Sequence, residues 1–224
     1  EGSCFAVLVK TNPEAIPPRK GISMFILQKG EGFSISRRLE KLGYKGIDSG
    51  EMVFKDFKVS ESNLIGGVEG KGFYQAVGGL ELGRINIAAR SVGIAKRALD
   101  EAVRYSQERK TFGKKICEHQ AIQLKLADMV TRYETSRLLV EQAANAYDSG
   151  QRCDLEAGMA KYSASEAAIE NSLEAMRIHG GYGYSKEFVI ERLYRDAPLM
   201  AIGEGTNEMQ KIIIARQLIE RNKI

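Results

Sequence analysis

A long stretch without proline is the feature that most constrains how this chain folds. The sequence has four prolines in 224 residues, and none of them lies between Pro18 and Pro198. Proline interrupts the hydrogen bonding of a helix interior, so this stretch leaves room for helices well beyond the mean length of about 11 residues. We therefore expect the chain to be mainly helical after its first third.

Apolar residues recur in this stretch at the spacing of three or four positions that is typical of a helix. Three long stripes and a shorter closing one predict four helices joined by short connections, which indicates an antiparallel four-helix bundle. The simplest interpretation of every stripe is core packing. The long stripes are Ile85, Ala88, Ala89, Val92, Leu99, Ala102 and Val103; Ile122, Leu126, Met129, Tyr133, Val140 and Tyr147; and Ala157, Ala164, Ala168, Ala175 and Ile178. On the shorter closing helix lie Ile212, Ile213, Arg216 and Ile219, with the arginine beside the three isoleucines.

The first third has a different character, because 11 of the 23 glycines precede residue 75. Short apolar runs between these turn-forming residues predict antiparallel strands. The runs are Phe5–Val9, Ile22–Leu27, Phe33–Ser36 and Glu51–Val59, the last with Val53, Phe57 and Val59 on one face. These strands are too few for an independent domain. We expect residues 1–70 to be the second half of a β-domain that begins in a preceding part of a longer protein, and residues 71–224 to form the bundle.

Composition excludes several classes of protein. The net charge of +4 fits small anionic ligands, and basic residues are interleaved with acidic ones, which argues against a nucleic-acid-binding face. No run reaches the roughly 18 apolar residues of a membrane span. Three scattered cysteines and two histidines support neither a disulfide framework nor a metal site, so we predict no metal. The cysteine usage suits a reducing compartment.

Segments at the ends of the predicted helices are candidates for ligand binding. The segment Glu108–Lys115 is either a helix end stopped by Gly113 or an anion site, in which Arg109 holds a phosphate beside the flat face of Phe112. The segment His179–Tyr184 is either a glycine stop or a place where bare backbone N–H groups meet a ligand.

Glu204 is the candidate for acid–base chemistry. It lies between Gly203 and Gly205, before a new helix that Thr206 can cap. It is either a solvated acid near a helix start or a carboxylate facing an apolar cavity, where burial would raise its pKa toward that of a general base.

Taken in order, these segments resemble one family, the flavin-dependent acyl-CoA dehydrogenases. The resemblance runs from about Lys20 to the end of the chain. Its motifs are KGISMFIL from Lys20, KLGY from Lys41, GFY from Gly72, RKTFG from Arg109, HQA from His119, GGYG from Gly180, RDA from Arg195 and EGTNE from Glu204. The resemblance implies the end of a middle β-domain followed by a carboxyl-terminal four-helix bundle, and a homotetramer, a dimer of dimers, with FAD held between paired subunits.

The resemblance also implies roles for single residues. Glu204 falls at the position of the base that removes the α-proton of an acyl-CoA while FAD accepts hydride from the β-carbon. Isovaleryl and long-chain types carry their base on the first bundle helix, where this chain has Gly83. The expected FAD contacts are Arg109, Phe112, Gln120, Arg177, His179, Gly180, Gly181, Thr206, Asn207 and Glu208. Of these, Arg109 and Gln120 are expected to reach the FAD of the neighbouring subunit. The expected acyl-CoA contacts are Lys20, Tyr74, Glu81, Arg84 and Gly205.

The implied electron acceptor is an electron-transfer flavoprotein, and the implied location is the cytoplasm of a prokaryote or the mitochondrial matrix of a eukaryote. Two alternatives remain open from the sequence. One is an acyl-CoA oxidase or another flavin enzyme on the same fold. The other is a non-catalytic helical oligomerisation module or a fragment that is inert as produced.

Overall fold

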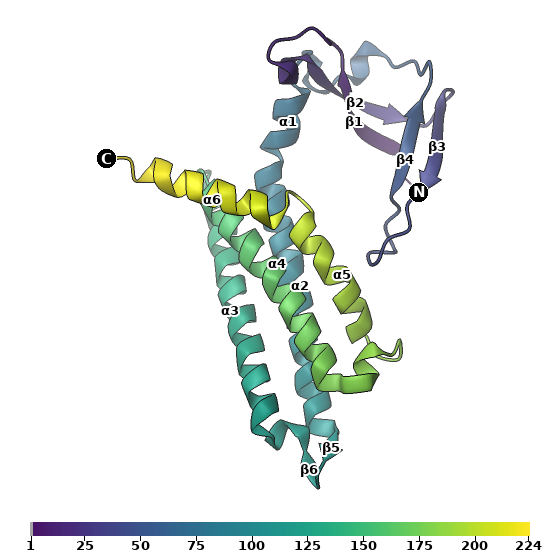
Figure 1. Ribbon diagram of the computed structural model, residues 1–224. Coiled ribbons are helices and arrows are strands. Elements are labelled where there is room, and N and C mark those ends of the chain that lie inside the picture. Colours follow the sequence, from purple (N-terminus) through teal and green to yellow (C-terminus); the bar gives the residue numbers. More distant parts are fainter. Residues whose placement is uncertain (1) are drawn as a thin grey trace. The chain divides into compact units, whose positions relative to one another are not determined.

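The computed structural model describes residues 2–224, which form two compact units that divide between Leu80 and Glu81 (Figure 1). The composition of the sequence predicts this boundary between residues 70 and 71. The units divide later because helix α1 (Gly72–Gly78) packs on the strands of unit 1. Gly72 is essential to that packing, since a Cβ atom there would lie 2.4 Å from the main-chain carbon of Ser23.

Unit 1 contains two small antiparallel sheets. Strand β1 (Cys4–Lys10) pairs with β2 (Ile22–Gln28), and β3 (Phe33–Arg38) pairs with β4 (Gly50–Phe54). Short 3₁₀ helices cover Pro18–Gly21, Glu61–Asn63 and Ile65–Gly67. The Phe5 ring of β1 stacks on Phe33 of β3 with a centroid separation of 5.4 Å and so links the two sheets, and Phe33 in turn contacts Phe54 of its own sheet at 5.5 Å.

The predicted strands are present, but the fourth is shorter than expected. It ends at Phe54 rather than Val59, because Asp56 adopts a left-handed conformation with φ of 51° that an extended strand does not allow. The prediction that Val59 shares a strand face with Val53 is therefore wrong.

Unit 2 is a bundle of long helices. Its members are α2 (Leu80–Glu108), α3 (Gln120–Asp148), α4 (Asp154–His179) and α5 (Ile190–Ile202), while α6 (Asn207–Arg221) crosses the end of the bundle against α4 (Figure 1). The hairpin of β5 (Lys110–Thr111) and β6 (Lys114–Lys115), with a 3₁₀ turn at Ile116–Glu118, joins α2 to α3. A 3₁₀ helix at Gly180–Tyr184 follows α4. The predicted fold class is confirmed.

The bundle core depends on small residues of α4. A stripe of fully buried alanines on α4 lets its neighbours approach closely and comprises Ala157, Ala160, Ala164, Ala168 and Ala175. One core cluster joins α2, α3, α4 and α5, and a second joins α2, α3 and α4. No helix in the described part of the chain is long and apolar enough to cross a membrane.

The fourth bundle helix differs from the prediction. It is α5, which contains Pro198, and not the closing helix α6. Proline at this position removes one helical N–H donor, while burial of Ile190, Leu193, Ala197 and Met200 holds α5 in the bundle. On α6 the expected core stripe is largely exposed: Ile212 is 42% and Ile219 is 68% exposed. Ala89, Val103 and Tyr147 of the other stripes are also exposed.

Candidate active site

Glu204 occupies a tight turn between α5 and α6. The turn places Glu204 at φ 54° and Gly205 at φ 88°, so two consecutive residues are left-handed. For a residue with a side chain this conformation costs about 1–2 kcal/mol, so surrounding contacts must hold it. The Thr206 hydroxyl accepts a hydrogen bond from the Met209 N–H at 3.5 Å, which confirms the prediction that Thr206 caps α6.

The Glu204 carboxylate lies directly over Gly83 of α2. A Cβ atom at Gly83 would lie 2.6 Å from Glu204 Oε2 and 2.9 Å from its Cδ, so a side chain at residue 83 would force the carboxylate out of this position. Glu204 is exposed in the described chain, as in the first of the two alternatives that the sequence leaves open, and burial in an apolar cavity is not observed here. The contact nevertheless brings together residues 83 and 204, which are distant in the sequence.

Two fully buried polar side chains, neither of them predicted from the sequence, hold the turn. Gln210 Nε2 donates to the carbonyl oxygens of Glu204 at 3.2 Å and Gly205 at 3.1 Å. Lys161 Nζ donates to the Ala201 carbonyl at 3.0 Å and to Asn207 Oδ1 at 2.8 Å. Burial lowers the pKa of Lys161 to about 8. The available signal was that Lys161 falls on the alanine stripe of α4, where a lysine must be buried.

The expected FAD contacts on the hairpin and after α4 gather around one cavity of unit 2. The cavity has a volume of about 810 Å³ and lies between the ends of α2 and α4, the hairpin and the start of α3. Of the predicted residues, it is lined by Arg109, Phe112, His179, Gly180 and Gly181. Phe112 is 96% exposed at the tip of the hairpin. Gln120 opens α3 between two lining residues, His119 and Ala121.

His179 forms the inner wall of this cavity. Its ring stacks on Tyr105 with a centroid distance of 4.2 Å, and Nδ1 lies 2.8 Å from the Ala175 carbonyl, so Nδ1 carries a hydrogen and donates it. Burial lowers the pKa of His179, which favours the neutral ring. The buried Nε2 atom has no hydrogen-bond partner among the described residues and is left as an acceptor.

Other predicted FAD contacts lie elsewhere. Arg177 is exposed and paired with Glu174. Thr206, Asn207 and Glu208 lie at the start of α6, beside the first half of α4. With a rise of 1.5 Å per residue, this part of α4 is about 20 Å along the helix from His179 at its end. The Asn207 side chain is buried and bonded to Lys161, Ser165 and Glu166, so only its main chain remains a predicted ligand contact.

Two predicted acyl-CoA contacts are drawn into a polar cluster at the start of α4. Arg84 is 8% exposed and pairs with Asp154 at 3.7 Å. Burial and a hydrogen bond with Asp154 raise the pKa of Glu81, whose Oε2 accepts from Cys153 Sγ at 3.7 Å. Burial, together with the nearby Glu81 charge, raises the pKa of Cys153 to about 11. In this geometry Arg84 does not present its guanidinium to a ligand at the surface.

The remaining predicted acyl-CoA contacts lie in unit 1, with the exception of Gly205. Arg19 Nε donates to the Tyr74 hydroxyl at 3.2 Å, and this hydrogen bond lowers the pKa of Tyr74. Lys20 is exposed next to Arg19 in the sequence. These residues form an exposed basic group suited to an anion.

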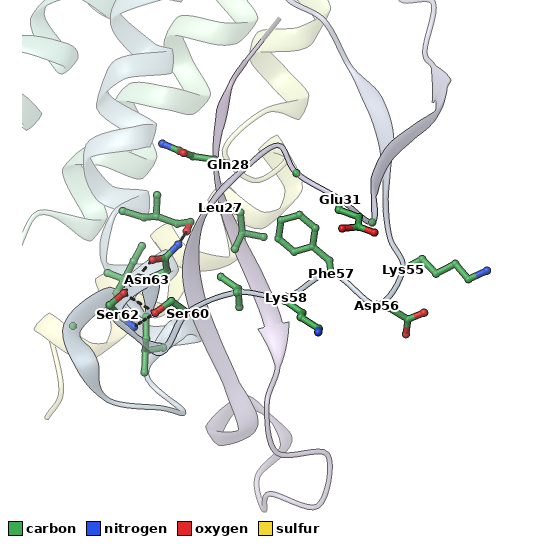
Figure 2. Close-up of a pocket in the computed structure, with 17 residues that line it drawn as sticks. Leu27, Gln28, Glu31, Lys55, Asp56, Phe57, Lys58, Ser60, Ser62 and Asn63 are labelled. Carbon is green, nitrogen blue, oxygen red and sulfur yellow. Dashed lines mark hydrogen bonds between the residues drawn. The ribbon is translucent and has the colours of Figure 1, made fainter.

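Unit 1 also contains a larger cavity, of about 1250 Å³, which includes none of the predicted site residues (Figure 2). Its labelled lining is Leu27, Gln28, Glu31, Lys55, Asp56, Phe57, Lys58, Ser60, Ser62 and Asn63. Three of its polar side chains bond to one another or to the backbone: Ser60 Oγ lies 2.8 Å from Ser62 Oγ, Ser62 Oγ donates to Asn63 Oδ1 at 3.4 Å, and Asn63 Nδ2 donates to the Ile26 carbonyl at 2.9 Å. Between residues 2 and 224, no group of three or more His, Cys, Asp or Glu side chains is arranged to hold a metal ion.

Comparison with known proteins gives concordant matches. The family description "Acyl-CoA dehydrogenase, C-terminal domain" matches residues 70–219. An acyl-CoA dehydrogenase of Bacillus subtilis is 47% identical over 202 residues, 90% of this chain and 53% of the relative. The caffeyl-CoA reductase-Etf complex subunit CarC of Acetobacterium woodii is 43% identical over 203 residues, 90% of this chain and 53% of the relative. The crystal structure of an acyl-CoA dehydrogenase from Geobacillus kaustophilus superimposes with a TM-score of 0.93 at 40% identity, covering 97% of this chain and 57% of that one.

Proposed function

Because the chain belongs to the acyl-CoA dehydrogenase family, we propose that the protein containing it converts an acyl-CoA to the trans-2-enoyl-CoA, with Glu204 as the base. The chain spans about half the length of the curated relatives it matches. The activity of the whole protein is therefore an inference from this half and from its family.

The observation that carries the proposal is the contact between Glu204 and Gly83. Members of the family place the base either at the position of Glu204 or at that of Gly83, according to the resemblance described above. Here a side chain at residue 83 would begin 2.6 Å from the Glu204 carboxylate. The two positions that can carry the base in this family therefore lie next to each other in space. In this chain Glu204 supplies the carboxylate at that location.

The geometry of the turn suits removal of a proton next to a thioester carbonyl. Such a proton is too weakly acidic for a carboxylate in water, so hydrogen bonds must stabilise the negative charge that develops on the carbonyl oxygen. The main-chain N–H of Glu204 takes part in no hydrogen bond within residues 2–224 and is therefore free to donate one. Base and donor then belong to the same residue, and the substrate is oriented between them.

The residues around the cavity of about 810 Å³ fit the adenosine diphosphate part of FAD. Arg109 supplies a guanidinium for a phosphate, and Phe112 and Tyr105 supply aromatic faces. The unpartnered Nε2 of His179 can accept from an amine or hydroxyl, and a Cβ at Gly180 or Gly181 would meet no atom within 4 Å, so their backbone is open to a ligand. When bound, FAD supplies the acceptor for the hydride that leaves the β-carbon.

The homotetramer proposed for this protein follows from the family resemblance, and the expected FAD contacts form two separate groups in one chain. Arg109 and Gln120 lie at one end of α4, and the segment Thr206–Glu208 lies about 20 Å away along that helix. This spacing is consistent with Arg109 and Gln120 reaching the FAD of a neighbouring subunit in a dimer of dimers. We take an electron-transfer flavoprotein as the electron acceptor, supported by the relative named as a subunit of an Etf complex.

The same relative is named a reductase, which favours a second candidate function. In that case the reaction runs in reverse, and Glu204 delivers the proton to the α-carbon of an enoyl-CoA. The two directions are separated by comparing anaerobic flavin reduction by a panel of acyl-CoA thioesters with oxidation of the reduced flavin by the corresponding enoyl-CoA thioesters.

The test of the base is Glu204→Gln in the full-length protein. Glutamine keeps the size but cannot accept the proton, so flavin content and oligomeric state should persist while flavin reduction by substrate falls by about 10²–10⁴-fold. The control is Glu220→Gln, an exposed acid on α6, which should leave the rate unchanged. Near-normal reduction in Glu204→Gln would reject the assignment and direct attention to Glu208.

A further inference from the structure

We propose that Gln210 and Lys161 are positioning residues that together hold the Glu204 turn in its active geometry. This inference rests on the proposed role of Glu204 as the base. Neither side chain touches the location over Gly83 where proton transfer takes place, so both act through the backbone of the turn.

The first observation is that Gln210 is bonded to the two left-handed residues themselves. Its amide nitrogen has two hydrogens, and each has a carbonyl partner: Glu204 at 3.2 Å and Gly205 at 3.1 Å. These two residues have the left-handed φ values of 54° and 88°. A left-handed glutamate persists only if its surroundings determine it, and the buried amide of Gln210 meets that requirement.

The second observation is that Lys161 ties together the two sides of the turn. From one ammonium group it donates to the Ala201 carbonyl in the last turn of α5 and to Asn207 Oδ1 in the first turn of α6. Asn207 is fixed in turn by Ser165 at 3.1 Å and by Glu166 at 2.6 Å. The start and end of the segment that carries Glu204 are therefore both bonded to α4.

The third observation is that Gln210 is in a site that packing alone does not explain. It is fully buried, and its Oε1 atom has no hydrogen-bond partner in the described part of the chain. An apolar side chain of the same length would avoid the cost of that unpaired oxygen. The two donors to the turn are what glutamine provides and methionine does not.

The experiment uses Gln210→Met in the full-length flavin-loaded protein. We expect the rate of flavin reduction by saturating acyl-CoA to fall about 10- to 100-fold, because a displacement of about 1 Å at the reacting groups costs this much. Substrate affinity should change little, and the isotope effect from an α-deuterated substrate should rise. The Gly203 amide donates to the Leu199 carbonyl at 2.8 Å, and its hydrogen exchange should be faster in Gln210→Met than in the parent. This measurement does not depend on the flavin reaction.

The matched control is Asn171→Leu. Asn171, on α4, has a fully buried side-chain amide like that of Gln210. Its nitrogen donates to the carbonyls of Met129 at 2.9 Å and Ala95 at 3.4 Å, and its oxygen has no hydrogen-bond partner among the described residues. It lies in the bundle centre away from the turn. Asn171→Leu should lower the thermal unfolding temperature as much as Gln210→Met does, yet leave the reduction rate and Gly203 exchange unchanged.

A double-mutant cycle with Glu204→Gln decides whether Gln210 acts through the base. If it does, Gln210→Met slows reduction in the parent and has almost no further effect when Glu204 is already Gln. Equal fold-losses in both backgrounds, an equal loss in Asn171→Leu, or a parent-like rate in Gln210→Met would each overturn the proposal. Normal reduction by Glu204→Gln alone would instead reject the base and, with it, this inference.

Lys161→Met is the second variant and applies if Gln210→Met does not fold. It removes the bonds at both sides of the turn but leaves those of Gln210 in place. The same loss of rate is expected in the parent, again with no further loss in the Glu204→Gln background. Additive losses in this cycle would overturn the proposal for Lys161.

Discussion

Replacing Gly83 by alanine should make the protein more stable and less active. Gly83 is in the fourth position of α2, and alanine there gains about 1 kcal/mol in helix propensity over glycine. For a chain of this size, that gain raises the unfolding temperature by about 2–4 °C. The clash of the new methyl group is with the end of an exposed glutamate side chain, which can move, so little of the gain is lost.

The cost of this substitution appears in catalysis. The new Cβ would begin 2.6 Å from Glu204 Oε2, and ordinary contact starts near 3.4 Å, so the carboxylate must shift by about 0.8 Å. A shift of that size at a reacting group costs roughly 10- to 100-fold in rate. Because the substitution does not remove the base, the loss should be smaller than for Glu204→Gln.

Stopped-flow reduction of the flavin and thermal unfolding measure the two effects. Gly93→Ala on the same helix is the control, since its Cβ would meet no atom within 4 Å. It should show the gain in stability and a parent rate. Parent-like reduction by Gly83→Ala, or an equal loss of rate in Gly93→Ala, would refute the reasoning.

Three further outcomes are expected. Lys161 has its pKa lowered to about 8 in the folded protein from 10.5, so the unfolded chain binds more protons between these values, and stability should rise from pH 8 to 10.5. Urea titrations should show a smaller rise in the free energy of unfolding over this pH range for Lys161→Met than for the parent. Parallel pH profiles of the two proteins would contradict this expectation. Arg109→Met should weaken FAD binding by about 10-fold or more, as judged by flavin retained on gel filtration, because a charge-assisted phosphate contact is lost. Replacing Ile212 and Ile219 by Asp should leave the unit folded but shift sedimentation toward smaller species if α6 contributes to the tetramer; an unchanged tetramer would show that it does not.

The long helices follow from the sequence because two independent signals agree there. The absence of proline allows α2, α3 and α4, and the apolar period gives each a face. Helix α5 is absent from the prediction because no apolar stripe is assigned to it there, although Ile190, Leu193 and Ala197 recur at helical spacing. Periodicity shows that a helix has an apolar face but not whether another part of the chain packs on that face. For this reason the prediction assigns the apolar face of α6 to the core, although it is exposed.

In the candidate site, too, some residues can be predicted from the sequence and others cannot. Short motifs point to Glu204, Arg109 and His179 because chemistry at a ligand restricts residue type. The support beneath them depends on contacts between distant positions, such as Lys161 with Ala201 or Gln210 with Glu204. These follow from how helices are joined in three dimensions. A lysine on an alanine stripe was the one visible sign of them.

The buried thiol of Cys153 makes the bundle suitable for labelling kinetics. Cys4 is exposed and Cys117 is half-buried, so an alkylating reagent reaches both in the folded protein, while Cys153 is fully buried and its pKa is raised to about 11. Only an opening of the contact between α2 and the start of α4 makes this third sulfur reactive. The rate at which mass spectrometry records alkylation of the peptide that carries Cys153 therefore measures how often that end of the bundle opens, in a sample that needs neither cofactor nor substrate.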